Sequence, residues 1–250
     1  LVTFASRHYR PLRMRFAGHL ARRYFDPVPR ESMVQRRERL GRMRSVLQAT
    51  YPDAHCELVF HNPLELLIAT ILSAQCTDRH VNRVTEHLFR KYRQAADYAG
   101  ASEEELARDI RSLGLFRNKA RNIRRACQAL VDRHGGEVPR SLDELTSLAG
   151  VGRKTANVVL GNAFNIEAGI VVDTHVIRLA GRLGLTTGTD PVKIETALIP
   201  LVPQAEWTRF SHWLIWHGRR RCSARKPDCP GCELRNLCPS AGRITPPSPG

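Results

Sequence analysis

A lysine beside a tight glycine turn is the first feature of the sequence that could do chemistry. Residues 148–156 read Leu-Ala-Gly-Val-Gly-Arg-Lys-Thr-Ala, so two glycines flank one apolar residue between two predicted helices. Glycines permit such a turn and leave backbone N–H groups uncovered at the start of the second helix, where the donors and the helix dipole attract a phosphate. The segment predicts a helix-hairpin-helix over about 141–163. Its candidate contacts with a phosphate backbone are Gly150, Val151, Gly152, Arg153 and Thr155.

Lys154 stands in the first turn of the second predicted helix, beside Arg153. The positive end of the helix dipole and the neighbouring cation both disfavour an ammonium group there. An amine that is partly neutral is a nucleophile and can form a Schiff base with a carbonyl carbon. A simple contact with a phosphate explains the same residue equally well, and the residues alone leave both interpretations open.

Asp173 follows the apolar pair Val171-Val172 and precedes a predicted helix. An Asp at that position most often caps the N-terminus of the helix. Its carboxylate can equally face Lys154 and stabilise positive charge on a sugar as a glycosidic bond breaks. His175 is a weaker candidate and is expected to be packed or hydrogen-bonded.

Four cysteines near the C-terminal end have the spacing of a metal site. Cys222, Cys229, Cys232 and Cys238 are separated by six, two and five residues. Four thiolates in so short a loop can close around one zinc ion or one iron–sulfur cluster, and the spacing does not distinguish between the two. The remaining three cysteines stand singly in apolar contexts. This usage indicates a reducing compartment rather than a secreted disulfide framework.

The charge of the chain favours a polyanionic partner. Thirty-nine Lys and Arg against 24 Asp and Glu leave a net charge of +15, and neutralising phosphates releases condensed counterions. Residues 1–50 hold 12 Arg and three acidic residues. A second basic stretch combines the arginines 219–221 with Arg225 and Lys226, inside the cysteine loop. We expect these five cations to contact phosphates, and a solvated basic loop is the alternative.

The elements that must position these residues are helical. Apolar residues recur with helical period, strand-like alternation is nearly absent, and 42% hydrophobic and 25% charged residues are typical of a packed domain. Helices are predicted at about 33–50, 63–74, 78–92, 102–112, 117–134, 141–148, 153–163, 174–183, 190–200 and 204–217. Asp78 is the predicted N-cap of the third. The sequence therefore predicts an all-α protein.

Four stretches together resemble endonuclease III, the helix-hairpin-helix DNA glycosylase and AP lyase family of base-excision repair. They are Leu72-Ser73-Ala74-Gln75-x-Thr77-Asp78, the hairpin 150–156, Val172-Asp173-Thr174-His175-Val176-x-Arg178 and the cysteine loop. The similarity covers about residues 35–240. The sequence departs from the family pattern in two ways. Ala149 replaces the usual Pro before the hairpin, and the spacing between Lys154 and Asp173 is one residue longer.

The resemblance implies roles for individual residues. Lys154 corresponds to the catalytic lysine and Asp173 to the catalytic aspartate. Gln75 resembles the residue that fills the gap left by the flipped nucleotide, and Leu115 resembles the wedge that faces the opposite strand. Composition alone would make Gln75 a surface residue and Leu115 a core residue. The cysteine loop of the family holds a [4Fe–4S] cluster, so the four cysteines are its expected ligands.

The resemblance also implies two helical domains with a DNA cleft between them. A six-helix barrel domain covers residues 56–166, and an iron–sulfur cluster domain joins 35–55 to 167–240. Residues 1–34 form a basic extension without a counterpart in the family and are expected to be flexible. The Pro-rich stretch 241–250 is expected to be a disordered tail.

The expected function is that of a bifunctional DNA glycosylase and AP lyase that removes oxidised pyrimidines from duplex DNA. Lys154 would form a Schiff base with the sugar, and β-elimination would cut the strand 3′ to the abasic site. A monofunctional mismatch glycosylase of the same superfamily is one alternative, which Lys154 argues against. A non-catalytic DNA-binding protein with a hairpin, a zinc loop and a basic arm is another.

The expected partner is double-stranded DNA containing damaged bases or abasic sites, bound by a monomer in the bacterial cytoplasm, at the nucleoid. No membrane partner is expected, because no apolar run reaches the roughly 18 residues that a spanning helix needs. No secretory signal peptide is expected either. The Arg-rich, acid-poor first 30 residues are also typical of an organelle transit peptide, and the sequence leaves organelle targeting open.

Overall fold

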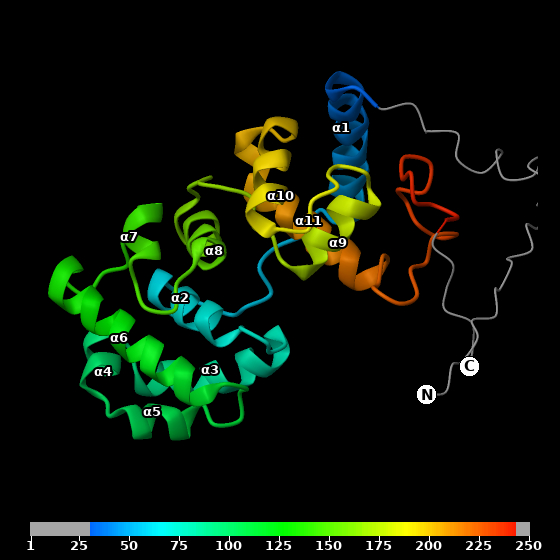
Figure 1. Cartoon of the computed structure of the whole chain (residues 1–250). Coiled ribbons are helices and arrows are strands. Elements are labelled where there is room, and N and C mark those ends of the chain that lie inside the picture. Colours follow the sequence, from blue (N-terminus) through cyan, green and yellow to red (C-terminus); the bar gives the residue numbers. More distant parts are fainter. Residues whose placement is uncertain (1–30, 244–250) are drawn as a thin grey trace, which may run out of the picture.

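The computed structural model describes residues 31–243, and the predictions for residues 1–30 and 244–250 lie outside that part of the chain. All regular secondary structure in the described residues is helical (Figure 1). This confirms the prediction of an all-α protein. The described helices include none that is both long enough and apolar enough to pass through a membrane.

Two separate hydrophobic cores organise the described chain, and they correspond to the two halves seen in Figure 1. The first core is built by α2 (Pro63–Leu72), α3 (Asp78–Lys91), α4 (Ala95–Gly100), α5 (Glu103–Asp109), α6 (Phe116–His134), α7 (Leu142–Thr146) and α8 (Arg153–Phe164). The second core is built by α1 (Met33–Thr50), α9 (Thr174–Arg182), α10 (Pro191–Leu198), the short 3₁₀ helix η1 (Ile199–Leu201) and α11 (Trp207–Arg220).

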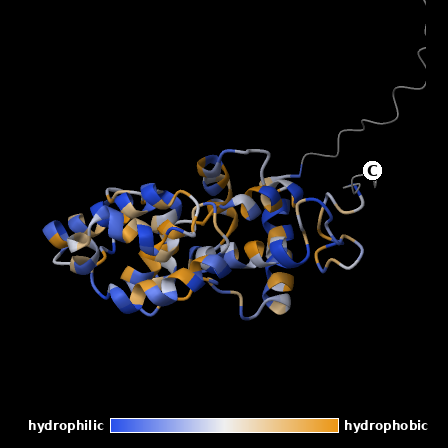
Figure 2. Cartoon of the chain, turned by 90° about the horizontal axis from the view of Figure 1, so that it is seen from below, coloured by the Kyte–Doolittle hydropathy of each residue, from blue (hydrophilic) through white to orange (hydrophobic). Residues whose placement is uncertain are grey.

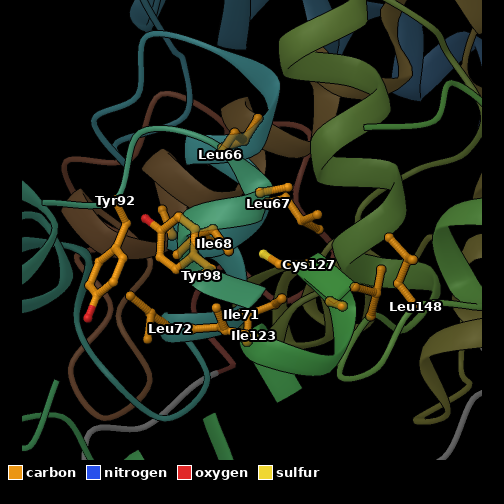
Figure 3. Close-up of a cluster of buried hydrophobic side chains, with 14 of the residues drawn as sticks. Leu66, Leu67, Ile68, Ile71, Leu72, Tyr92, Tyr98, Ile123, Cys127 and Leu148 are labelled. Atoms are coloured by element: carbon orange, nitrogen blue, oxygen red, sulfur yellow. The ribbon is translucent and has the colours of Figure 1, made fainter. Parts of the chain in front are cut away.

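Helix α2 is the centre of the first core. Every residue from Leu66 to Leu72 is buried, which is the pattern of a helix that is covered on all sides. It packs against α8 and α6, and Tyr98 of α4 and Cys127 of α6 lie in the same cluster of side chains (Figure 3). Because α2 is packed on all sides, its C-terminal end is fixed, and so is the start of the turn 73–76 that follows it.

Helix α11 joins the two halves. It packs against α9 and α1 in the second core and also against α8 of the first core. Phe210, Trp213 and Leu214 are its fully buried residues in the second core. Hydrophobic and hydrophilic residues alternate along the helices (Figure 2), which is the pattern of helices that bury one face.

Helices α2, α5 and α11 have somewhat different bounds from those predicted, and three further differences have a local physical reason. Helix α4 was not predicted, because its six residues are too few to show a period. The N-cap of α3 is Thr77, whose side chain accepts a hydrogen bond from the backbone of His80, and Asp78 is the first helical residue. Residues 31–34 belong to the folded part, because Ser32 and Gln35 form a capping box at the start of α1.

Candidate active site and DNA-facing surface

Lys154 and Asp173 line the same pocket, which has a volume of about 90 Å³ and opens to solvent. The wall on one side comes from α2, the start of α3 and α8 of the first core. The opposite wall comes from the N-terminus of α9 and from α11 of the second core. A larger groove along α3 contains neither residue. The pocket between the two cores is therefore the candidate active site.

Asp173 both caps a helix and lines the pocket of Lys154, which are the two alternatives that the sequence left open. It is the N-cap of α9, and its Oδ1 accepts hydrogen bonds from the backbone N–H groups of His175 at 2.8 Å and Val176 at 2.9 Å. Among the described residues no hydrogen bond reaches Oδ2. The cap therefore fixes the carboxylate by one oxygen, and the second oxygen has no hydrogen bond within the described residues.

Lys154 is an exposed residue in the first turn of α8. The N-cap of this helix is Gly152, which provides no side-chain acceptor, and the first turn contains no acidic residue. The first backbone N–H groups of α8 therefore have no partner within the helix, which is the condition for an anion site at a helix N-terminus. The structure thus combines an accessible amine with uncovered backbone donors.

The hairpin before α8 is held closely against α6. Gly150 has a φ of +76°, and a Cβ at this position would lie 2.8 Å from the Cβ of Asn122. Both the backbone conformation and the space therefore require glycine here. Gly150 and Gly152 are exposed, whereas Val151 is 5% exposed and packs in the first core. The Val151 side chain is thus an anchor for the turn, and only its backbone can face a ligand.

Arg153 and Thr155 complete the predicted hairpin contacts. Thr155 is half-buried. Arg153 forms an ion pair with Glu195 of α10, with 2.7 Å between Nε and Oε2, and this contact raises the pKa of the guanidinium. The guanidinium therefore forms an intramolecular ion pair. The sequence did not predict this pair, because Glu195 lies 42 residues away.

Gln75 and Leu115 are exposed and have left-handed backbone conformations. Their φ values are +57° and +58°, and among the described residues only Asn165 shares this feature outside glycine. The Leu115 side chain is 53% exposed, so the assignment to the core from composition is wrong. Left-handed backbone costs a residue with a side chain about 1–2 kcal/mol, and such strain concentrates at functional sites.

The pocket also contains an ion-pair cluster that was not predicted. Arg219 of α11 bonds to Glu57 and, at 2.7 Å, to Asp78 at the start of α3. These contacts connect the second core to the first across the pocket mouth. Asp78 belongs to one of the sequence motifs, but no local pattern predicts its ion pair, because Arg219 lies 141 residues away.

Burial keeps two titratable side chains of the pocket, Cys56 and His212, uncharged at neutral pH. Burial raises the pKa of the Cys56 thiol to about 11, so this thiol stays protonated and is a poor nucleophile. Burial lowers the pKa of His212 to about 4, and its Nε2 lies 2.7 Å from the Oδ1 of Asn162. Burial also lowers the pKa of His175, whose Nδ1 contacts Arg178 at 3.1 Å. His175 is therefore packed and hydrogen-bonded, as predicted.

The four cysteines of the loop after α11 line a single cavity beside α9. All four are free thiols, and a guanidinium nitrogen of Arg182 lies 3.2 Å from the Cys222 sulfur. Among residues 31–243, no group of three or more His, Cys, Asp or Glu side chains is arranged around a position for a single metal ion. Four cysteines are a donor set that both a zinc ion and an iron–sulfur cluster use.

The five cations near this loop are not equivalent. Arg219 is paired as described, Arg221 forms ion pairs with Asp228 and Glu233, both at 2.7 Å, and Arg220 stacks on Trp216 with 3.7 Å to the ring centroid. The expectation that these five cations contact phosphates stays a prediction. Arg225 and Lys226 are exposed and form no ion pair within the described residues.

Comparisons with known proteins agree with this geometry. The family described as HhH-GPD superfamily base excision DNA repair protein matches residues 68–204. Endonuclease III of Synechocystis sp. is 51% identical over 209 residues, which cover 84% of this chain and 95% of that protein.

Two similar solved structures contain DNA. A non-covalent Endonuclease III–DNA complex has a TM-score of 0.79 and 50% identity, covering 83% of this chain and 97% of that chain. A trapped Endonuclease III–DNA covalent intermediate has a TM-score of 0.79 and 49% identity with the same coverage. The chain belongs to the HhH-GPD superfamily and, within it, to the endonuclease III family of base-excision repair enzymes, which are DNA glycosylases with AP lyase activity.

Proposed function

We propose that Lys154 is the nucleophile and Asp173 the supporting carboxylate of this chain, and that its substrates are oxidised pyrimidines in duplex DNA. The observation that supports the two roles is the shared pocket, in which an exposed amine and a carboxylate with one unbonded oxygen come from opposite walls. The trapped covalent DNA intermediate of a relative that is 49% identical supports covalent chemistry.

The proposed reaction begins when the damaged nucleotide leaves the base stack and enters the pocket, which costs a few kcal/mol. The neutral amine of Lys154 attacks C1′ of the sugar, and the bond to the base breaks with its electron pair leaving on the base. Asp173 stabilises the positive charge that develops on the sugar. The nitrogen then gives up a proton, the C1′–O4′ bond breaks as O4′ takes up a proton, and the opened sugar is left as an iminium. The iminium acidifies the C2′ proton. Loss of that proton expels the 3′ phosphate and cuts the strand.

Gln75 and Leu115 fill the space that the flipped nucleotide leaves. Their exposure supports this role, because an intercalating side chain must be free of the protein core. Their backbone strain supports it as well, because neither residue is in the conformation that folding alone would favour. An apolar wedge is the side chain that proteins use to separate stacked bases.

The backbone of the DNA is bound by the hairpin 150–155 and by Arg225 and Lys226. The N-terminus of α8 offers uncovered N–H groups, and the two cations are exposed. Because each is free to exchange its counterion for a phosphate, both add to the salt dependence of binding.

Cys222, Cys229, Cys232 and Cys238 hold a [4Fe–4S] cluster. When bound, the cluster supplies four iron–sulfur bonds that staple the loop to itself beside α9. The residues 221–243 contain no helix or strand, so this staple would replace the hydrogen bonds that regular structure provides. The test is analysis of the purified protein for iron and acid-labile sulfide. Zinc in their place, with one ion per chain, contradicts the proposal.

The two hydrophobic cores support a division into a barrel domain over 56–166 and a cluster domain over 35–55 and 167–240. The DNA lies across the cleft between them, and one chain carries the whole site. We expect a monomer that acts on duplex DNA in the bacterial cytoplasm, at the nucleoid.

Borohydride reduction tests the role of Lys154, because it traps a Schiff base between enzyme and abasic DNA. Lys154→Ala should abolish trapping and leave DNA binding measurable. Lys193→Ala removes another exposed lysine, on α10, and should trap as the unchanged protein does. Trapping by Lys154→Ala would remove this residue from its role. A panel of duplexes, each with one damaged base, tests the substrate class.

A further inference from the structure

Lys119 is a buried lysine that the proposed reaction does not use. It lies in the first turns of α6 and is 4% exposed. An ammonium in the interior is costly unless hydrogen bonds and charge compensate it. Among the described residues no carboxylate pairs with it, so the compensation must come from other groups.

The first of these groups is the C-terminus of α2. The Lys119 Nζ donates a hydrogen bond to the carbonyl oxygen of Leu72, the last residue of α2, at 2.8 Å. Carbonyls at a helix C-terminus lack partners within the helix and carry the negative end of its dipole, so they favour a cation. The last turn of α2 contains no basic residue of its own. Lys119 therefore supplies the missing cation from α6.

The second group lies on the other side of Gln75. The Lys119 Nζ also lies 3.3 Å from the sulfur of Cys76, and the backbone N–H of Cys76 closes the turn by bonding to the carbonyl of Ser73 at 3.1 Å. The two contacts of one ammonium thus flank the strained turn, one before Gln75 and one after it. The ammonium acts as a clamp on the loop that presents Gln75.

Lys119 is connected to Leu115 through the backbone of α6. Its N–H donates to the carbonyl oxygen of Leu115 at 3.0 Å, which is the first bond of the helix and fixes the Lys119 side chain relative to Leu115. Leu115 is the N-cap of this helix and has no side-chain cap bond. One residue therefore contacts both strained, exposed positions, Leu115 through its backbone and the Gln75 turn through its side chain.

We propose that Lys119 is a positioning residue that holds Gln75 and Leu115 at a fixed separation, so that both enter the DNA together. This inference rests on the proposed insertion of these two side chains. A leucine or methionine would fill the same volume without the cost of burying a charge, so a lysine that served packing alone would be a poor choice. The ammonium is explained by the link that it makes between α6 and the end of α2.

The test compares duplex and single-stranded substrates. Excision from a duplex requires the vacated stack to be filled, whereas β-elimination on a single-stranded abasic oligonucleotide does not. Lys119→Met keeps the length of the side chain and removes the ammonium. We expect its duplex excision rate to fall about tenfold to a hundredfold, because misplacement of positioning groups has effects of that size. Borohydride trapping on the single strand should stay within about twofold. Lys193→Met is the matched control and should change neither.

A second readout follows the DNA itself. A fluorescent base analogue beside the lesion brightens when the stack opens and dims when a side chain fills it. With Lys119→Met the fluorescence should rise as the stack opens, and its later decrease, as a side chain fills the gap, should be slow or incomplete. An equal loss on duplex and single strand, with unchanged fluorescence kinetics, would show that Lys119 only supports the fold and would overturn the proposal.

Two further variants keep the result unambiguous. If Lys119→Met does not fold, Cys76→Ala removes one of the two contacts of the clamp, and an unchanged ratio of duplex to single-strand activity overturns the proposal. Gln75→Ala and Leu115→Ala test the insertion roles directly. If these two leave the ratio unchanged, the insertion roles fail. If they lower it and the changes at Lys119 and Cys76 do not, only the positioning role fails.

Discussion

The guanidinium of Arg153 holds the carboxylate of Glu195 by two hydrogen bonds, Nε to Oε2 at 2.7 Å and Nη2 to Oε1 at 3.1 Å. The Glu195 side chain is 6% exposed and that of Arg153 is 42% exposed. Asn157 adds a third bond to the same carboxylate at 3.1 Å. This connection fastens the first turns of α8, and with them Lys154, to α10 of the second core.

Loss of this ion pair should lower stability. Glu195→Ala removes the acceptor of all three bonds and is expected to reduce the free energy of unfolding by about 1–3 kcal/mol. This is less than the 3–5 kcal/mol typical of a fully buried pair, because Arg153 can turn to water. Urea unfolding measures the change. Trapping on abasic DNA should also decrease, and an unchanged rate would show that α8 holds its place without α10.

Asp173 can be tested for its two tasks separately. Asn caps helices about as well as Asp does, so Asp173→Asn should keep the stability of the protein. It removes the charge, and base excision should therefore be lost. Asp173→Ala should remove both and cost about 0.5–2 kcal/mol of stability. Denaturation curves and single-turnover excision distinguish the variants. Full excision by Asp173→Asn would contradict a role of the charge.

The three left-handed residues provide a matched set. Glycine at such a position removes strain, so Gln75→Gly, Leu115→Gly and Asn165→Gly should each raise the free energy of unfolding by up to about 1 kcal/mol. The first two should lower excision from duplex DNA because the inserting side chain is lost. Asn165 ends α8 and serves as the control, for which activity should stay unchanged. Equal activity in all three variants would argue against insertion.

Stability should fall on mild acidification because of His212. Burial, with His55 and the cation Arg219 acting in the same direction, lowers the pKa of His212 to about 4, whereas an unfolded His titrates near 6.5. Between these values the unfolded chain binds a proton that the folded chain does not. The contribution is therefore intact above about pH 6.5 and decreases as the pH falls.

The expected loss from His212 between pH 7 and pH 5 is about 2 kcal/mol. Urea unfolding at both pH values measures it. His212→Gln removes the titrating group and should lose correspondingly less over the same interval. If the variant and the unchanged protein lose the same amount, His212 is not the group responsible.

The exposed cations of the cysteine loop should affect the salt dependence of DNA binding. Lys226→Ala is expected to reduce the slope of log affinity against log salt concentration by about one. Arg225→Ala should have a similar effect, and both should weaken binding to all sequences alike. Arg90→Ala removes a cation that is already paired with Glu86 and is the control. If both loop variants leave the slope unchanged, Arg225 and Lys226 do not contact phosphates.

Much of the fold follows from local sequence. The bonds of an α-helix join residues four apart, and its buried face repeats with the same short period, so caps and apolar spacing predict the helices. The expected helix 33–50 coincides with α1, and Ser102 and Ser141 cap α5 and α7. One helix that was not predicted is α4, whose six residues pack on α6 through Tyr98 and its neighbours.

The sequence by itself also determined the chemistry on offer, namely an amine at a helix start, a carboxylate at another and four thiols with a fixed spacing. Tertiary structure decided how these groups are used. It brought Lys154 and Asp173 to one pocket, took up Arg153 in an ion pair, and buried Lys119 beneath the Gln75 turn. The physical reason is range. A polar side chain bonds to whichever group the packing of distant helices brings near, and no local pattern records that partner.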